Sequence, residues 1–220
     1  MFPDIAPARY GCQDRAVAQV RPYRGIDASE RLATRRARFI EAGLDLLSTP
    51  PGDPTVRAIC AQSGVSVRYF YESFTDKDDF AAAVFDRVIA DIAATTQAAV
   101  TAAPLPEQGR AGMANIVHTI AGDPRIGQLL FGAQLSNEVV ARKRIESTAF
   151  FAALLGQHVG EALQLPEGHR RLAGTHFTVG GVAQTISAWL AHEITCTPDE
   201  LVDHLAFLLA TLTGLSVRRQ

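Results

Sequence analysis

The amino-acid sequence predicts an all-α protein. Apolar residues recur at spacings of three and four residues over most of the chain, whereas no segment shows the two-residue alternation of a strand. The 220 residues, 47% of them hydrophobic and 20% charged, are enough for one large helical domain or for a small and a larger one. No apolar run reaches the length of a membrane span and no signal peptide is evident, so we expect a cytoplasmic protein.

The N-terminal segment, residues 1–28, has no sustained apolar period and contains three prolines. We expect a flexible arm there. From about Ser29, an expected N-cap, an apolar stripe runs from Leu32 to Leu47 at helical spacing, until "STPPGDP" ends it. This pattern predicts the first helix.

Two short helices are predicted next. Thr55 is placed to cap "VRAICAQSG", and Gly64 stands where a helix ends in a left-handed turn. Ser66 is placed to cap a second short helix over residues 67–73. Two short helices joined by a glycine turn form a helix-turn-helix, which lays its second helix in the major groove of DNA.

The rest of the chain continues as helices. One begins at Lys77 and runs to about Thr101, where "AAPLPEQG" interrupts it. Further helices are predicted near 107–121, 124–131, 137–163, 168–193 and 198–216. We therefore divide the chain into the arm 1–28, a helix-turn-helix domain 29–77 and a helical domain 78–220, which we expect to bind a ligand and to dimerise.

The second short helix has two kinds of residue. Its spacing predicts a core face formed by Val67, Phe70 and Phe74. Arg68 and Tyr69 point elsewhere, near the N-terminal end that reaches base edges in this motif. Arg68 can bind guanine through two hydrogen bonds, and Tyr69 can contact a thymine methyl group.

Three further residues suit phosphate. Tyr71 offers a hydroxyl, whereas Thr55 and Lys77 stand at helix N-termini, which favour anions. The role of Glu72 stays open, because phosphates repel a carboxylate. Residues 1–77 hold 11 Lys+Arg against 9 Asp+Glu, and residues 78–220 hold 10 against 14, so the basic end is the predicted DNA-binding end.

The segment "TRRARFIEAGLDLLS…TVRAICAQSGVSVRYFYESFTDKDDF" resembles the DNA-binding region of the TetR family of transcriptional regulators over about 50 residues. The resemblance implies two sets of DNA contacts. Those to phosphates come from Thr55, Ser66, Tyr71 and Lys77, and those to bases from Val67, Arg68 and Tyr69. It also implies a variable helical domain that binds a small molecule, and a homodimer through the helices near 168–193 and 198–216.

The second half also contains candidate ligand-binding residues, in which apolar side chains surround a few polar ones. Pockets for drug-sized or lipid-like molecules have this composition, but an ordinary helical core has it too. The candidates are Met113, Val117, His118, Phe131, Phe151, Leu154, His158, His176 and Gln184.

Catalytic and metal-binding patterns are missing from the sequence. The six histidines and three cysteines have no metal-ligand spacing, and no nucleophile and base can be paired from it. Gly180-Gly181 lacks the lysine of a phosphate loop and suggests a close contact between helices. We therefore expect neither an enzyme nor a cofactor or metal ion.

Our hypothesis is a ligand-responsive transcriptional regulator, in its family's usual role a repressor. A homodimer would bind a palindromic operator in double-stranded DNA, and a small apolar or amphipathic molecule would release it by acting on the helix that begins at Lys77. Two alternatives stay open: a DNA-binding regulator without small-molecule input, and an enzyme that uses the helical pocket. The effector, the operator, the sign of regulation and a role of the arm in DNA binding are left open.

Overall fold

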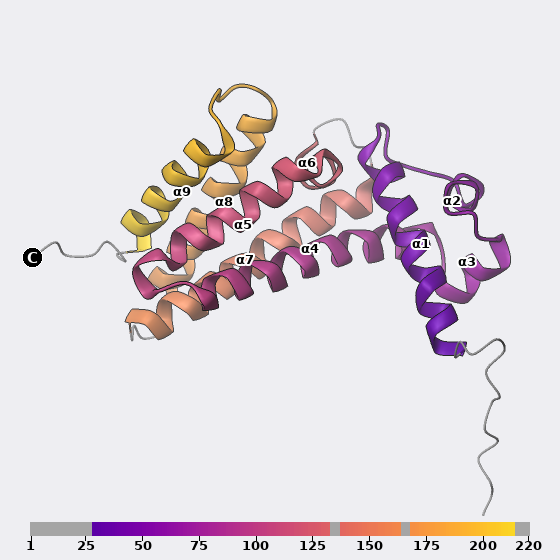
Figure 1. The fold of residues 1–220 in the computed structure, drawn as a ribbon, viewed down its shortest axis with the longest axis horizontal. Helices are drawn as coiled ribbons and strands as arrows, with labels where there is room; N and C mark the ends of the chain where they lie inside the picture. Colours follow the sequence, from indigo (N-terminus) through magenta and orange to yellow (C-terminus); the bar gives the residue numbers. More distant parts are fainter. Residues whose placement is uncertain (1–27, 133–136, 164–167, 214–220) are drawn as a thin grey trace, which may run out of the picture.

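The computed structural model describes residues 28–132, 137–163 and 168–213, and over these ranges it contains helices and no strand (Figure 1). The predicted all-α class is confirmed for this part of the chain. The elements are α1 (Ala28–Ser48), α2 (Val56–Ser63), α3 (Val67–Ser73), α4 (Lys77–Ala102), the 3-10 turn η1 (Leu105–Glu107), α5 (Gln108–Gly122), α6 (Pro124–Phe131), α7 (Glu138–Leu163), α8 (His169–Leu190) and α9 (Pro198–Thr213).

Helices α1 to α3 form a compact group at one end of α4, and the later helices form an elongated bundle along it (Figure 1). Helix α1 begins at Ala28, so Ser29 lies within its first turn and the predicted N-cap at Ser29 is wrong. The predicted arm lies outside the described residues as far as residue 27. The proline-rich segment after Ser48 ends α1, as expected.

The turn between α2 and α3 has the predicted backbone. Gly64 has φ 65° and ψ 22°, a left-handed conformation that glycine adopts without strain. The Thr55 hydroxyl oxygen accepts a hydrogen bond from the Ala58 amide at 3.2 Å, so Thr55 caps α2. Ser66 is the N-cap residue of α3, as predicted, but its side chain makes no capping hydrogen bond.

An aromatic cluster holds the three-helix group together. Phe39 of α1 packs edge to face against Phe70 and Phe74, with ring centroids 5.7 and 5.8 Å apart, and Phe80 of α4 packs against Phe74 at 5.2 Å. All four rings are buried. Val67 is 44% exposed, so the prediction that it belongs to this core is wrong.

Helix α4 joins the three-helix group to the bundle. It approaches α1 most closely at Gly43, where an added Cβ would lie 2.4 Å from a methyl carbon of Val84 and 2.6 Å from the Phe80 ring. One apolar cluster then continues without a break from the aromatic rings to Leu129 of α6 and Val140 of α7. The predicted domain boundary therefore coincides with the start of α4 rather than with a gap in the core, and the division into domains stays a prediction.

A second apolar cluster joins α5, α8 and α9. It contains Val117, Ile186 and Leu205, each almost fully buried. The indole N–H of Trp189 donates a hydrogen bond to the carbonyl of Cys196 at 3.0 Å, which fixes the connection between α8 and α9. Among the described residues, no helix has the length and hydropathy of a membrane span.

Two details of α8 differ from prediction. The helix ends at Leu190 rather than near residue 193, and His192 follows with a positive φ of 61°. A Cβ added at Gly180 or Gly181 would meet no atom within 4 Å. The predicted close helix contact at these glycines is therefore wrong within the described part of this chain.

Candidate DNA-binding surface and ligand cavity

Helix α3 has one buried side and one exposed side. Phe70 anchors it in the aromatic cluster, which leaves Val67, Arg68 and Tyr71 facing outward. The Arg68 side chain is 85% exposed and Tyr71 is 59% exposed. The Tyr71 ring rests edge to face on Phe70 at 5.3 Å, so the core fixes the position of this exposed ring.

Tyr69 is less exposed than predicted. It is partly buried against the apolar cluster, and the guanidinium of Arg35 lies over its ring, 4.1 Å from the centroid. Arg36 likewise covers the Phe74 ring and donates a hydrogen bond to the Ser73 carbonyl at 2.7 Å. These two α1 arginines hold α3 in place. The arginine-rich start of α1 was visible in the sequence, but this positioning role was not predicted.

Arg68 and Glu72 form an ion pair on the exposed side of α3, with 3.1 Å between Arg68 Nε and the carboxylate. The pair bonds through Nε, so the two terminal nitrogens of Arg68 are not used in it. A surface pair of this kind contributes little stability, but it restricts the conformations of a long side chain. Glu72, whose role the sequence left open, is placed to orient Arg68.

The predicted phosphate ligands lie on α3 and at the starts of α2, α3 and α4: Tyr71, Thr55, Ser66 and Lys77, respectively. The Thr55 hydroxyl can still donate a hydrogen bond while its oxygen caps α2, and the Ser66 hydroxyl is not occupied by capping. Lys77 Nζ binds both carboxylate oxygens of Asp53 at 2.8 and 3.1 Å, which raises the pKa of Lys77. A phosphate there has to compete with Asp53.

The first turn of α4 is less open to an anion than its position suggested. The Asp76 carboxylate accepts hydrogen bonds from the amides of Asp78 and Asp79 at 2.9 and 2.8 Å. Two of the backbone donors at this helix start are therefore occupied by a negative side chain. Phosphate binding there would rest mainly on the Lys77 ammonium group.

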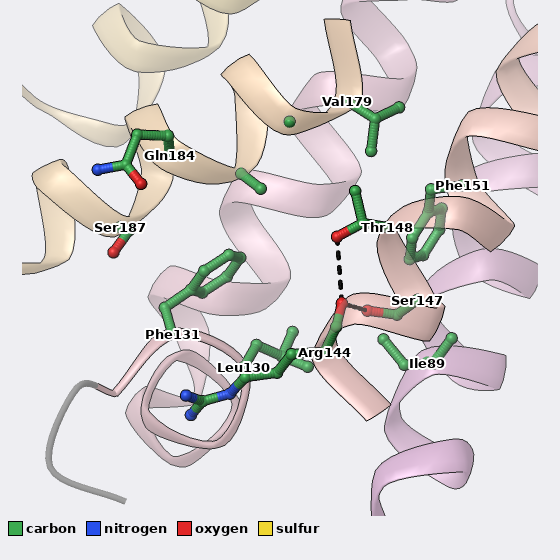
Figure 2. Close-up of a pocket in the computed structure, with 12 residues that line it drawn as sticks. Ile89, Leu130, Phe131, Arg144, Ser147, Thr148, Phe151, Val179, Gln184 and Ser187 are labelled. Atoms are coloured by element: carbon green, nitrogen blue, oxygen red, sulfur yellow. Dashed lines mark hydrogen bonds between the residues drawn. The ribbon is translucent and has the colours of Figure 1, made fainter. Parts of the chain in front are cut away.

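A cavity of about 360 Å³ lies between α4, α6, α7 and α8 (Figure 2). Its volume is within the range of small-molecule sites. The described residues that line it are Ile89, Leu130, Phe131, Arg144, Ser147, Thr148, Phe151, Val179, Gly180, Ala183, Gln184 and Ser187. Phe131, Phe151 and Gln184 were predicted from the sequence, and their contact with a ligand stays a prediction.

The other six candidates lie away from this cavity. Met113 and Val117 belong to the core that α5 shares with α9. His118 is exposed, with its Nε2 3.0 Å from a carboxylate oxygen of Asp199. Leu154 and His158 on α7 and His176 on α8 do not line the cavity either. The structure therefore does not gather the nine candidates into one site.

Arg144 is a cavity residue that the sequence did not single out. Its guanidinium donates hydrogen bonds to three carbonyls at the C-terminal end of α6: those of Leu129 at 2.8 and 3.0 Å, Gly132 at 3.0 Å and Gln128 at 3.1 Å. The side chain is half-buried, and desolvation lowers the pKa of Arg144. These bonds attach the end of α6 to α7.

Arg125 attaches the other end of α6 to α1. Its guanidinium binds the carboxylates of Glu41 at 2.7 Å, Asp45 at 2.6 Å and Asp123 at 2.7 Å. The hydrogen bonds from Arg125 lower the pKa of Asp45 and of Asp123 and raise the pKa of Arg125. Helix α6 thus connects the cavity to α1, the helix against which α3 packs. No sequence signal indicated Arg125.

Comparisons with known proteins find similarity in fold but not in sequence. No protein-family model matches the chain, and no curated protein matches its sequence. Solved structures do match. The fatty acid degradation regulator FadR from Bacillus halodurans has a TM-score of 0.66 at 16% identity, covering 84% of this chain and 97% of its own. A TetR-family regulator from Streptomyces coelicolor has a TM-score of 0.64 at 18% identity, covering 86% and 84%.

The chain has the TetR fold. A third match is FadR from Bacillus subtilis in complex with stearoyl-CoA, with a TM-score of 0.65 and 18% identity over 79% of this chain and 96% of that one. The B. subtilis and S. coelicolor proteins are transcriptional regulators, and the B. halodurans protein is a regulator of fatty acid degradation. At such identities the likeness concerns the fold, so the roles of individual residues rest on the geometry described above.

Proposed function

We propose that this protein is a ligand-responsive transcriptional regulator, acting as a repressor, that binds a palindromic operator as a homodimer. One observation carries the proposal. The aromatic cluster fixes a seven-residue helix so that Val67, Arg68 and Tyr71 face outward from its exposed side. The N-terminal residues of such a helix contact base edges in helix-turn-helix proteins. The TetR fold of the chain supports the same function.

Exposed apolar side chains support a homodimer through α8 and α9. Phe177 on α8 is 69% exposed and Phe207 on α9 is 70% exposed, and Leu172, Leu208 and Leu212 lie exposed on the same two helices. Extended apolar surface marks interaction sites. One α3 helix contacts only a few base pairs, whereas a two-fold dimer places two such helices in successive major grooves.

The cavity supports a response to a small molecule. Ile89 of α4 lines it, and α4 begins beside α3 at Lys77. Helix α6 provides a second connection through Arg125 and α1. A ligand that binds one arrangement of these helices better than another changes the DNA affinity, and DNA then weakens ligand binding by the same factor. The B. subtilis FadR complex with stearoyl-CoA supports an amphipathic ligand.

The experiment that tests this function is selection of bound sequences from a random duplex DNA library, followed by affinity measurements across salt concentrations. We expect an inverted repeat whose half-sites lie about one helical turn apart, and a logarithm of affinity that falls linearly with the logarithm of salt concentration. The absence of any enriched sequence would refute sequence-specific DNA binding. Enrichment without stabilisation by any compound in a thermal-shift screen would leave a regulator without small-molecule input.

A further inference from the structure

The charge balance of the cavity is uneven. Arg144 is the only charged residue among the twelve described residues that line it. Within the described chain, no carboxylate lies within ion-pair distance of its guanidinium, and its hydrogen bonds all go to backbone carbonyls at the end of α6. A positive charge is therefore held at the cavity wall without a counter-ion.

The two arginines that hold α6 differ sharply in this respect. Arg125, at the start of α6, is paired with three carboxylates. Arg144, at the opposite end, receives only the partial negative charge of the helix terminus, roughly half an elementary charge for a full-length helix. Its Nη1 donates to Gly132 alone, so one of its two hydrogens remains available. The cavity end of α6 thus keeps an excess of positive charge.

The rest of the cavity suits an amphiphile. Ile89, Leu130, Phe131 and Phe151 provide apolar and aromatic contacts from three helices. On α8, the side chains of Gln184 and Ser187 have no hydrogen-bond partner within the described chain. In Figure 2 the Phe131 ring is drawn between these two α8 residues and Arg144. A few polar groups around an apolar volume are the usual composition of a selective small-molecule site.

We propose that this cavity binds an amphiphilic molecule with one carboxylate head group, and that Arg144 pairs with that carboxylate. The inference rests on the proposed ligand response and specifies its chemistry. A guanidinium binds a carboxylate through parallel, charge-assisted hydrogen bonds. In a half-buried site this pairing favours an anionic ligand over its neutral analogue by roughly tenfold or more. An uncharged or cationic head group leaves the arginine without a counter-ion.

The carboxylate also affects the attachment of α6. It would compete with the Leu129 and Gly132 carbonyls for the same N–H groups, and so weaken the bonds that fix the end of α6 to α7. The other end of α6 stays bound to α1 through Arg125. The head group of the ligand is therefore placed at a contact whose strength affects the position of α1.

The test compares three ligands of equal chain length by calorimetry on the full-length protein: decanoate, decanol and decyltrimethylammonium, each below its micelle concentration. We expect decanoate to bind roughly tenfold or more tightly than decanol, and the cation to bind weakest. In Arg144→Gln, which lacks the charge, the ratio of decanoate to decanol affinity should fall to about one. Arg144→Lys, which keeps the charge without the planar fork, should give an intermediate ratio.

A second variant avoids the α6 attachment, because Arg144→Gln alters a helix end and can impair folding. Gln184 is exposed and unpaired, so Gln184→Glu adds a negative charge at the cavity without removing a contact. It should weaken decanoate several-fold more than it weakens decanol. Equal affinity for decanoate and decanol, an unchanged preference in Arg144→Gln, or no binding of any of the three ligands would overturn the proposal. DNA selection without amphiphile tests the regulator function separately, so the two failures are distinguishable.

Discussion

The close contact of α1 with α4 at Gly43 predicts a specific response to Gly43→Ala. The new Cβ would lie 2.4 Å from Val84 Cγ2 and 2.6 Å from Phe80 Cζ, whereas ordinary contacts are 3.4–4 Å, so the helices have to separate by about 1 Å. Both neighbours are fully buried, so neither can turn away into solvent. Overpacking costs about 1–3 kcal/mol, and replacing a helical glycine by alanine offsets at most about 1 kcal/mol of it.

Two contacts below 3.0 Å with fully buried side chains put the cost at the upper end of that range. We therefore expect a net loss of about 2 kcal/mol in the free energy of unfolding, which for a chain of this length lowers Tm by about 4–8 °C. Circular dichroism at fixed protein concentration measures it. Gly122→Ala is the matched control, because Gly122 ends α5 in an exposed position with no atom within 4 Å of an added Cβ. That variant should change the free energy of unfolding by less than about 0.5 kcal/mol.

A double variant tests the cause. Val84→Ala removes the methyl carbon nearest the new Cβ, so Gly43→Ala combined with Val84→Ala should be more stable than the sum of the two single losses predicts. If Gly43→Ala leaves Tm unchanged or raises it, or if the two losses simply add, the argument from close packing is refuted.

Three further predictions concern DNA binding, assembly and acid stability. Lys77→Ala should weaken binding to selected and random duplexes alike and flatten the salt slope by about one per protomer. Arg68→Ala should instead relax the preference at one base position. Fluorescence anisotropy measures both, and equal losses on both DNAs for both variants would contradict this division. Phe207→Asp, on the exposed face of α9, should raise the dimer dissociation constant at least tenfold in analytical ultracentrifugation, and an unchanged constant would remove α9 from the interface. Arg125→Met should cost about 1–2 kcal/mol at neutral pH, since it removes three partly exposed ion pairs. The aspartates that bind Arg125 have pKa values below the ordinary 3.8 in the folded protein, so their contribution is complete above that pH and is lost as the pH falls below it. Urea unfolding between pH 6 and 2.5 should show a smaller acid loss in Arg125→Met than in the parent protein.

The helices were largely predictable because local residues decide where each one begins and ends. Prolines and Gly64 interrupt the helical period at the positions where the structure leaves it, and α3 has the predicted bounds. Val67 shows the limit of this reasoning. Its spacing from Phe70 is correct for one helix face, but it is the first residue of a seven-residue helix, and it is 44% exposed where Phe70 is fully buried. Periodicity shows which residues share a face of a helix, but it does not show how far along that face the neighbouring helices extend.

The cavity was less predictable because it depends on how four helices cross. Val117 and Phe131 have the same kind of apolar neighbours in the sequence, yet Val117 fills the core beneath α9 and Phe131 lines the cavity. Arg144 lies in "ARKRIES" beside two other cations. Those two pair with Glu146 or Asp86 at the surface, and only Arg144 reaches the end of α6. Nothing local distinguishes the three.

Because α4 is long, a small tilt of this helix at the cavity produces a larger displacement at its DNA-binding end. Ile89, at the cavity, lies 12 residues from Lys77, which corresponds to about 18 Å along a helix. A tilt of about 5° around Ile89 would therefore displace the Lys77 end by about 1.5 Å, and opposite tilts in the two protomers would change the separation of the α3 helices by about 3 Å. Successive major grooves lie about 34 Å apart on one face of the duplex, so a shift of about one-tenth of that distance moves hydrogen-bonding groups out of reach of their bases.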